Sequence, residues 1–267
     1  MTGDDALYFD IRKHLIHRVG GFFHNARYLP GKTCSVCFNP TDQHVCPRCL
    51  SHRSEFGPRL ADNVAILAFV RGGSSGPPHQ SAHTMRAYKG RPPAEKCAMD
   101  LELMTVAATL IHQDCFTLAF GYRWDSITFV SSINNPGNSH PVAQIARMVY
   151  GVPVTGRFLL WPGPGFSDPD RTVRADRFSV PDKYRGRVEG KNVLVVDDTW
   201  VSGAKIQSAA VALHDAGAAH VTAFSIGRWC RYDWPSHKAV LDTQRTPYDA
   251  YVCPARYDEC QYEARVR

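Results

Sequence analysis

The stretch of this 267-residue chain that most constrains its fold runs from Val193 to Lys205. It opens with an uninterrupted apolar run, Val-Leu-Val-Val, which predicts a strand buried on both faces of a parallel sheet. The segment that follows repeats apolar residues at helical spacing: Ile206, Ala209, Ala210 and Leu213. Asp197, Asp198 and a turn of small residues should therefore lie at the carboxyl end of a strand, where open α/β sheets bind their ligands.

The turn between this strand and helix has the features of an anion site. Free backbone N–H groups at a helix start, aided by the helix dipole, favour a phosphate, and Gly203 allows it to approach closely. Ser202 is expected to cap the helix and to offer a hydroxyl donor. Carboxylates repel a phosphate but accept hydrogen bonds from the vicinal hydroxyls of a ribose, or hold hydrated Mg²⁺. A ribose 5-phosphate across the turn would satisfy both halves.

The stretch from Val193 to Lys205 resembles the phosphoribosyl-pyrophosphate motif of type I phosphoribosyltransferases. The resemblance implies that Asp197 and Asp198 bind the ribose hydroxyls. It also implies that the 5-phosphate is bound by the turn residues Thr199, Val201, Ser202, Gly203, Ala204 and Lys205. The family usually has Thr where this chain has Val201, Ser202 and Lys205. Val201 removes one hydroxyl donor, which Lys205 could replace with a charge. The alternative is an ordinary strand–turn–helix with an acidic loop.

A second strong signal is a pair of C-x-x-C knuckles, which contain Cys34, Cys37, Cys46 and Cys49. Four thiolates at this spacing suit one tetrahedral structural Zn²⁺, with no position left open for catalysis. A redox pair or two disulfides are the alternatives. Zinc knuckles ahead of such a domain resemble the ComF-type, competence-associated branch of the family.

The resemblance implies a division of the chain into four parts. We expect a helical lead-in at residues 1–29, a zinc-ribbon-like module at 30–53, a phosphoribosyltransferase-like domain at 54–232 and a C-terminal tail at 233–267. Residues 85–90 look like the family's "Y-K" segment, and residues 172–180 lie where the family carries a basic stretch ending in an aromatic residue.

Two loops are further candidates for ligand contact. By the resemblance, the pyrophosphate loop consists of Ser131, Ser132, Ile133 and Asn134. In this chain no Arg or Lys follows the loop until Arg147. A simple strand–helix connection is the alternative. A Gly/Pro-rich loop at 159–170, followed by several arginines, is interpreted as either a lid over an anionic substrate or a solvated linker.

The nine cysteines and the composition indicate the environment of the chain. An odd number of cysteines with C-x-x-C spacing favours metal ligation in a reducing cytoplasm. Cys97, Cys115 and Cys230 are interpreted as small core residues, whereas Cys253 and Cys260 are either tail residues or half of a second metal site with His237. The net charge of +6 suits phosphate-rich ligands or nucleic acid, or is dispersed over a solvated surface. No apolar run of 18 residues indicates a membrane span.

The sequence therefore predicts an α/β fold with a parallel sheet of the type I phosphoribosyltransferase kind and a small N-terminal zinc module. The expected elements are strands at 64–70, 127–132, 193–198 and 219–226, and helices within 4–24 and at 94–111, 139–150 and 203–216. The leading function is Mg²⁺-dependent binding of phosphoribosyl pyrophosphate and transfer of the phosphoribosyl group to a nitrogen nucleophile. No side chain is named as catalytic, since the departure of pyrophosphate needs no protein nucleophile. The alternative is a non-catalytic sugar-phosphate sensor or scaffold in nucleic-acid handling.

Overall fold

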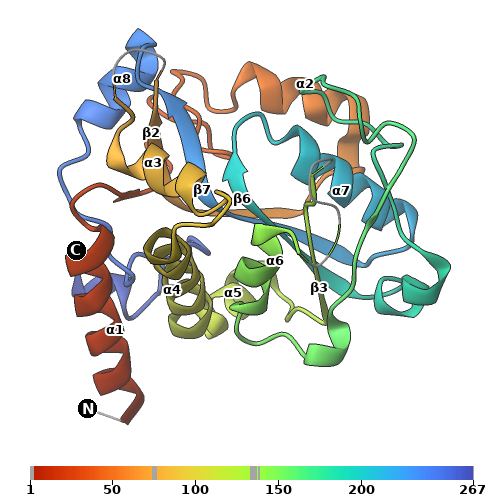
Figure 1. Ribbon diagram of the computed structural model, residues 1–267, viewed down its shortest axis with the longest axis horizontal. Helices are drawn as coiled ribbons and strands as arrows, with labels where there is room; N and C mark the ends of the chain where they lie inside the picture. Colours follow the sequence, from red (N-terminus) through yellow and green to blue (C-terminus); the bar gives the residue numbers. More distant parts are fainter. Residues whose placement is uncertain (1–2, 74–76, 133–136, 138, 267) are drawn as a thin grey trace.

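A five-stranded sheet with the order β1-β2-β7-β6-β3 forms the centre of the molecule (Figure 1). The computed structural model describes residues 3–73, 77–132, 137 and 139–266. The strands are β1 (His24–Asn25), β2 (Asn63–Gly72), β3 (Ser126–Phe129), β6 (Asn192–Trp200) and β7 (His220–Arg231). Strands β2, β7, β6 and β3 run parallel, and β1 pairs antiparallel with β2. The predicted α/β class with a mostly parallel sheet is confirmed.

Helices and one small ribbon surround the sheet. The helices are α1 (Gly3–Val19), α2 (Pro47–Phe56), α3 (Gln80–Ala87), α4 (Glu95–Ile111), α5 (Gln113–Phe120), α6 (Pro141–Arg147), α7 (Ala204–Asp215) and α8 (Pro235–Asp242). The 3₁₀ turns are Gly57–Arg59, Val154–Gly156, Asp182–Arg187 and Glu263–Arg265, and the ribbon pairs β4 (Trp161–Pro162) with β5 (Phe178–Ser179). Among the described residues no single helix is long and apolar enough to cross a membrane. The helices α4 and α5, bent by 62° at their junction, pass that test only as a pair.

Side-chain alternation along β6 divides the core into two layers. Leu194 and Val196 pack with α3, α4 and α6 on one face of the sheet, whereas Val193 and Val195 pack with α7 and the cysteine knuckles on the other (Figure 1). All four side chains are fully buried. A strand covered on both faces must be apolar at every position, which is why the sequence shows a run instead of an alternation.

The predicted elements lie close to their observed positions, with informative differences at their ends. Strand β6 continues to Trp200, so both aspartates belong to the strand end itself. Helix α7 begins at Ala204 after Gly203, which occupies the capping position we assigned to Ser202. Gly203 takes that position because its φ of +78° is costly for a residue with a side chain. The knuckle segment also contains α2, which begins at Pro47 with the fixed φ that suits a first helical turn.

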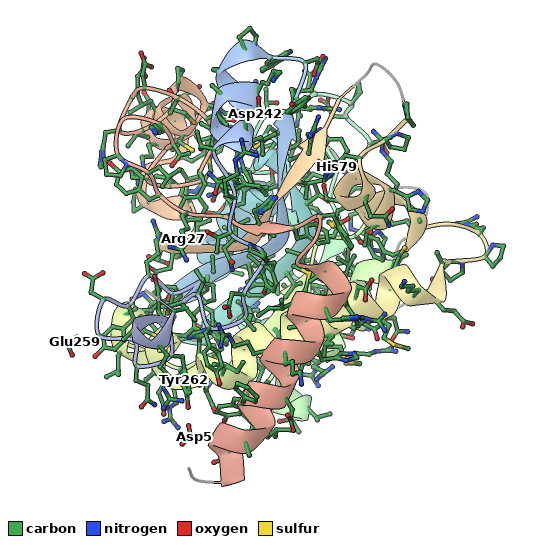
Figure 2. The ribbon with its side chains drawn as sticks, turned by 90° about the vertical axis from the view of Figure 1, so that its left-hand side faces the viewer. Asp5, Arg27, His79, Asp242, Glu259 and Tyr262 are labelled. Carbon is green, nitrogen blue, oxygen red and sulfur yellow. The ribbon has the colours of Figure 1, made fainter. Side chains whose placement is uncertain are left out.

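The C-terminal residues after α8 return to the start of the chain. The Arg12 guanidinium donates to both carboxylate oxygens of Asp249, at 2.8 and 2.7 Å. Asp249 also exchanges backbone–side-chain hydrogen bonds with Asn25. Further along, the Tyr262 ring meets Tyr8 edge-on at 5.6 Å, and Figure 2 shows Tyr262 beside α1. The end of the chain therefore packs on α1.

We predict that His237 makes the fold acid-sensitive. Burial, followed by the charge of Arg228, lowers the His237 pKa to about 4, and its Nδ1 accepts a hydrogen bond from the Arg231 backbone N–H at 2.9 Å. Because the folded pKa lies below the unfolded value of about 6.5, the stabilisation is complete above pH ~6.5 and is lost as the pH falls toward 4. The effect amounts to at most about 3 kcal/mol.

The matched variant is His237→Asn, which keeps an acceptor but cannot titrate. Urea unfolding between pH 4 and 7 should give a shallower fall of the free energy of unfolding for this variant than for the wild type. An identical pH slope in the two proteins would contradict this assignment of the titrating group.

Candidate functional site

A cavity of about 410 Å³ opens at the carboxyl ends of β3 and β6. Its lining brings together segments that are distant in sequence, among them Ser131 and Ser132 after β3, the end of β6 with the turn to Lys205, Lys89 after α3, and residues 168–171. The carboxyl ends of neighbouring parallel strands lie at one edge of the sheet, so this convergence follows from the topology. The structure thus gathers the described residues of the predicted site in one place.

Asp197 and Asp198 differ in environment although they are adjacent. The Asp198 side chain is 4% exposed and lies 2.5 Å from the Lys89 ammonium. Burial alone would raise the Asp198 pKa, but attraction and hydrogen bonding by Lys89 outweigh it, and the net pKa is lowered. For Asp197, desolvation and the neighbouring charge of Asp198 both act in one direction and raise the pKa well above its usual value. The pair therefore carries one firmly held negative charge.

Tyr88, next to Lys89, borders the same pair. Its side chain is 2% exposed, and burial together with the negative charge of Asp198 raises the pKa of the Tyr88 hydroxyl well above 10. The phenol therefore remains a neutral hydrogen-bond donor beside the carboxylate. The segment that resembled the family's "Y-K" motif thus lies against the aspartates, although we had not named Tyr88 or Lys89 as site residues.

The turn that follows β6 is shaped by Gly203. A Cβ at this position would lie 2.5 Å from the Trp200 indole, so the turn accommodates only glycine without displacing that buried ring. Ser202 Oγ accepts a hydrogen bond from the Ala204 N–H at 3.3 Å. Lys205 is exposed in the first turn of α7 and lines the cavity. Backbone donors, a hydroxyl and an ammonium thus converge at a helix N-terminus, which is an arrangement that binds anions.

Arg228 of β7 donates hydrogen bonds to the turn after β6. The sequence did not indicate this role. Arg228 is 3% exposed, and its Nη1 donates to the carbonyls of Trp200 and Val201 at 2.7 and 2.5 Å. Its Nη2 donates to Asn39, in the knuckle segment. A single buried guanidinium therefore ties the turn to the cysteine module. The only sequence signal was a cation within a mostly apolar part of the strand, between Ile226 and Cys230.

The loop after β3 is described in part. Ser131 and Ser132 line the cavity, and Ser132 Oγ lies 3.1 Å from His140 Nε2. His140 Nδ1 accepts from the Val142 N–H and thereby caps α6, where we had expected Ser139. Ile133 and Asn134, the other two predicted loop residues, lie outside the described residues. Burial lowers the His140 pKa to about 4, so its ring is neutral at physiological pH.

The arginines that follow the Gly/Pro-rich loop have different roles. Arg174 forms ion pairs with Asp168 at 2.6 Å and with Asp176 at 2.9 Å. Arg177 is 1% exposed and donates to the carbonyls of Asp168 and Asp170. Both side chains hold the loop together. Arg171 and Arg177 both line the cavity, but only Arg171 is exposed, which leaves its guanidinium available to an anion there.

A larger cleft of about 1140 Å³ adjoins the cavity. The two share Lys89, Arg171 and the turn residues. The cleft extends to the cysteine knuckles on one side and to Trp229 and Trp234 on the other. Cationic side chains stack on these indoles: Arg86 lies 5.1 Å from the Trp229 ring and Arg231 lies 5.2 Å from the Trp234 ring. The surface offers aromatic faces and positive charge together.

The four knuckle cysteines form one buried cluster whose sulfurs all lie within 4.8 Å of one another. Cys37 Sγ and Cys46 Sγ are 3.8 Å apart, which equals the edge of about 3.8 Å expected for a tetrahedron with Zn–S bonds of ~2.3 Å. The backbone N–H groups of Val36 and Cys46 donate to Cys34 Sγ at 3.4 and 3.3 Å. The cluster therefore has the donor set and spacing of a tetrahedral metal site.

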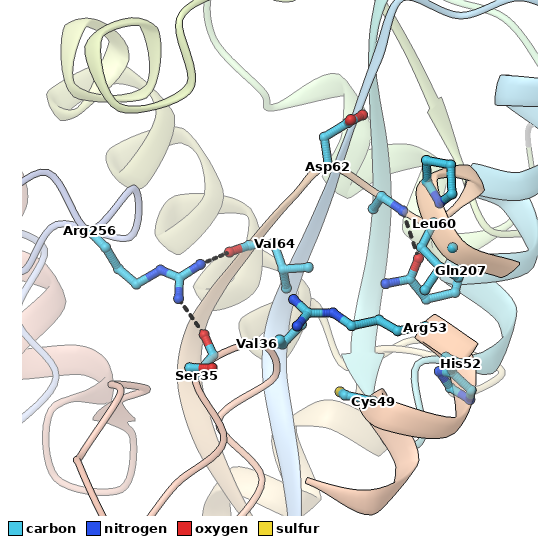
Figure 3. Close-up of a pocket in the computed structure, with 13 residues that line it drawn as sticks. Ser35, Val36, Cys49, His52, Arg53, Leu60, Asp62, Val64, Gln207 and Arg256 are labelled. Atoms are coloured by element: carbon cyan, nitrogen blue, oxygen red, sulfur yellow. Dashed lines mark hydrogen bonds between the residues drawn. The ribbon is translucent and has the colours of Figure 1, made fainter. Parts of the chain in front are cut away.

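A smaller cavity of about 290 Å³ separates this module from the body of the domain (Figure 3). Gln207 of α7 accepts there from the Ala61 N–H at 2.9 Å. Arg256, from the C-terminal segment, donates across the cavity edge to the carbonyls of Ser35 and Val64, at 2.6 and 3.3 Å (Figure 3). The end of the chain thus reaches into the first knuckle.

The remaining cysteines depart in part from expectation. Cys253 and Cys260 do lie together, but their partners are Cys115 and His112, and His237 is engaged elsewhere with the Arg231 backbone. Cys115, which we interpreted as a core residue, belongs to this cluster. The junction between α4 and α5 and the C-terminal segment come together only in the folded chain. The spacing of these four residues in the sequence therefore does not reveal the cluster.

Two solved structures share limited similarity with the chain. The first is the structure of the allosteric regulatory enzyme of purine biosynthesis. That protein is 25% identical to this chain over 46% of the chain, with a TM-score of 0.26. The match spans about a quarter (26%) of that protein's length. The second is a phosphoribosyltransferase from Corynebacterium diphtheriae: 19% identity over 55% of this chain and 92% of that one, with a TM-score of 0.28. No protein-family model and no curated protein matches this sequence.

We predict that Gly203→Ala destabilises the protein and weakens anion binding at the turn. The added methyl group meets Trp200 and is also forced to a φ of +78°, so the expected loss is about 2–4 kcal/mol. Gly190→Ala is the matched control, because Gly190 has a φ of +65° with open space around it. Urea unfolding should give a loss of only about 1 kcal/mol for the control. Equal losses in the two variants would show that contact with Trp200 is unimportant.

Proposed function

We propose that this chain binds phosphoribosyl pyrophosphate together with Mg²⁺ and transfers the phosphoribosyl group to a nitrogen nucleophile. The observation that carries this proposal is the convergence of Asp197, Asp198, the glycine turn and the Ser131–Ser132 segment on one cavity of about 410 Å³. A sugar carrying a phosphate at one end and a pyrophosphate at the other needs these three environments side by side. The arrangement supports a type I phosphoribosyltransferase fold.

The ribose and its 5-phosphate suit the β6 end of the cavity. Carboxylates accept hydrogen bonds from vicinal hydroxyls, and Asp198 remains ionised because Lys89 compensates its charge. The phosphate would accept from the backbone N–H groups of the turn and from Ser202, and Lys205 would add a cation. Val201, which has no hydroxyl, contributes only its backbone.

The pyrophosphate suits the part of the cavity lined by Ser131 and Ser132, and Lys89 and Arg171, which line the same cavity, would supply positive charge. As pyrophosphate leaves, positive charge would develop on the sugar, and the ionised Asp198 would help to stabilise this charge. The donor set of two adjacent carboxylates also fits hydrated Mg²⁺, which would neutralise charge on the leaving group. No side chain is required to form a covalent bond.

The nucleophile would enter from the larger cleft, since that cleft shares Lys89 and Arg171 with the cavity. Trp229 and Trp234 offer flat apolar faces on which a heterocyclic acceptor can stack.

The cysteine module completes the proposal as a structural zinc site of a ComF-like protein in a reducing cytoplasm. Its four sulfurs leave no ligand position open, so the metal would act on stability alone. The division into a lead-in (1–29), a zinc module (30–53), a phosphoribosyltransferase-like domain (54–232) and a tail (233–267) is part of the same proposal.

A second candidate is a non-catalytic sensor or scaffold that binds nucleic acid. The larger cleft favours it, because exposed cations stand beside tryptophans at the edge of the cysteine module: Arg48, Arg86 and Arg171. Cations that contact phosphates and aromatic faces that stack on bases are the usual means of binding single strands.

Isothermal titration with phosphoribosyl pyrophosphate, with and without Mg²⁺, tests the leading proposal. The wild type should bind only weakly without Mg²⁺, and the double variant Asp197→Asn/Asp198→Asn should bind at least about 100-fold more weakly, because several charge-assisted hydrogen bonds are lost. Asp114→Asn, an exposed carboxylate on α5, is the control and should bind as the wild type does. Unchanged affinity in the double variant would refute the assigned ribose site.

Turnover and nucleic-acid binding separate the two candidates. Pyrophosphate release in the presence of a panel of nitrogenous bases would establish transfer. Ligand binding without release, combined with single-strand binding that weakens with salt and is lost in Arg48→Glu/Arg86→Glu, would establish the scaffold.

A further inference from the structure

A second cluster of metal-ligand type lies apart from the knuckles, in the core layer on the other face of the sheet. It consists of His112, Cys115, Cys253 and Cys260, whose ligand atoms all lie within 4.8 Å of one another. The four residues are 0–7% exposed. His112 lies at the junction between α4 and α5, Cys115 in the first turn of α5, and the two remaining cysteines in the C-terminal segment.

The His112 ring is held in the orientation that metal binding requires. Its Nε2 lies 2.9 Å from the Ala250 carbonyl, which can only accept, so the proton resides on Nε2. The unprotonated Nδ1 then faces the sulfurs and lies 3.5 Å from Cys260 Sγ. A histidine that donates its other N–H to a backbone carbonyl is the usual outer-shell arrangement of a metal ligand.

Backbone and side-chain contacts also prepare the cysteines. The Glu263 N–H donates to Cys260 Sγ at 3.4 Å, which stabilises negative charge on that sulfur. The Cys253 N–H donates to Glu263 Oε2 at 3.0 Å, which fixes the backbone of the second ligand. Both bonds come from one 3₁₀ turn, Glu263–Arg265. The cluster thus has the same N–H···S support as the knuckle site.

We propose that His112, Cys115, Cys253 and Cys260 bind a second structural Zn²⁺ in a tetrahedral Cys₃His site. Three soft thiolates with one imidazole favour zinc over hard cations, and four protein ligands leave no position for substrate. Three cysteines cannot all pair as disulfides, whereas one metal ion satisfies all of them. Binding releases the thiol protons to solvent and forms three Zn–S bonds and one Zn–N bond, with no change of oxidation state.

The site closes a long loop and thereby fixes the end of the chain. His112 and Cys260 are 148 residues apart, and bringing them together costs conformational entropy that metal–ligand bonds can offset. Without a metal, three buried sulfurs and an imidazole would hold little to keep the 253–260 loop in place. The metal therefore accounts for the burial of Cys253 and Cys260 at the two ends of a loop that has few regular elements.

The 253–260 loop in turn carries Arg256, which joins the two cysteine clusters. Arg256 donates to the Ser35 carbonyl inside the first knuckle (Figure 3), and its guanidinium lies 5.3 Å from the Phe38 ring. Arg256 and Phe38 are the two non-glycine residues with positive φ in the described chain, at 55° and 56°. Such conformations persist where the surroundings fix them, here a metal-bound loop on each side. We infer that the second metal positions Arg256 to hold the first module on the sheet.

Zinc counting on the full-length protein tests the site and does not depend on the proposed transferase activity. Native mass spectrometry and elemental analysis should give two zinc ions for the wild type. Cys253→Ser and Cys260→Ser should each retain only the zinc ion of the knuckle cluster. Cys34→Ser should retain only the zinc ion of the second cluster. Cys97→Ser is the control, because Cys97 is buried outside both clusters, and it should retain two. A wild type with one zinc, or a Cys253→Ser variant with two, would overturn the proposal.

The wild type alone provides a second test should a variant fail to fold. Alkylation of the native protein should spare Cys115, Cys253 and Cys260 until a chelator is added, after which peptide mass spectrometry should find all three modified. Cobalt substitution should give thiolate charge-transfer absorption for seven sulfurs over two metals. Immediate modification of these cysteines in the holoprotein, or a mass 2 Da lower that indicates a disulfide, would refute the site.

Arg256→Met tests the link between the two clusters. This variant should still bind both zinc ions. A chelator should remove the zinc ion of the knuckle cluster about tenfold faster than from the wild type, because charge-assisted hydrogen bonds that hold the knuckle are lost. Arg245→Met, a change in the same C-terminal region, should leave the release rate unaltered. Unchanged release from Arg256→Met would overturn the coupling.

Discussion

The buried guanidinium of Arg228 is the interaction on which the arrangement of the site most depends. A charge that is 3% exposed must be surrounded by acceptors, and these acceptors are two carbonyls of the turn after β6 and the Asn39 side chain. Losing any of them would leave a costly buried charge. One residue therefore connects the turn after β6, strand β7 and the cysteine module.

Charge compensation operates in the same way on the other side of the cavity. Two adjacent carboxylates at a strand end repel each other, and Lys89 relieves this by pairing with the more buried Asp198. The cation comes from a segment roughly a hundred residues earlier in the chain, carried there by α3 and the parallel pairing of β2 with β7. The sheet's topology thus supplies the electrostatics of the site.

The periphery of the domain depends on different forces. The knuckle segment has little apolar core of its own, and the C-terminal segment has few regular elements, although both bury apolar side chains such as Phe38 and Tyr251 in the core layers of the sheet. The knuckle segment gathers four cysteines, and the cysteines of the C-terminal segment lie against His112 and Cys115. Arg256 connects the two cysteine clusters. In both places buried thiols and hydrogen bonds add to the apolar packing.

The sequence alone determined the features that depend on residues close together in the chain. The β6 run, the α7 stripe and the C-x-x-C spacing each indicated their structures correctly, because the residues concerned lie within one element or one turn of chain. The tertiary structure decided the rest: the Lys89–Asp198 pair, the position of Arg228 beneath the turn, and the partners of Cys253 and Cys260. Those contacts join segments up to 148 residues apart, and no periodicity or spacing records which distant side chains a fold will bring within bonding distance.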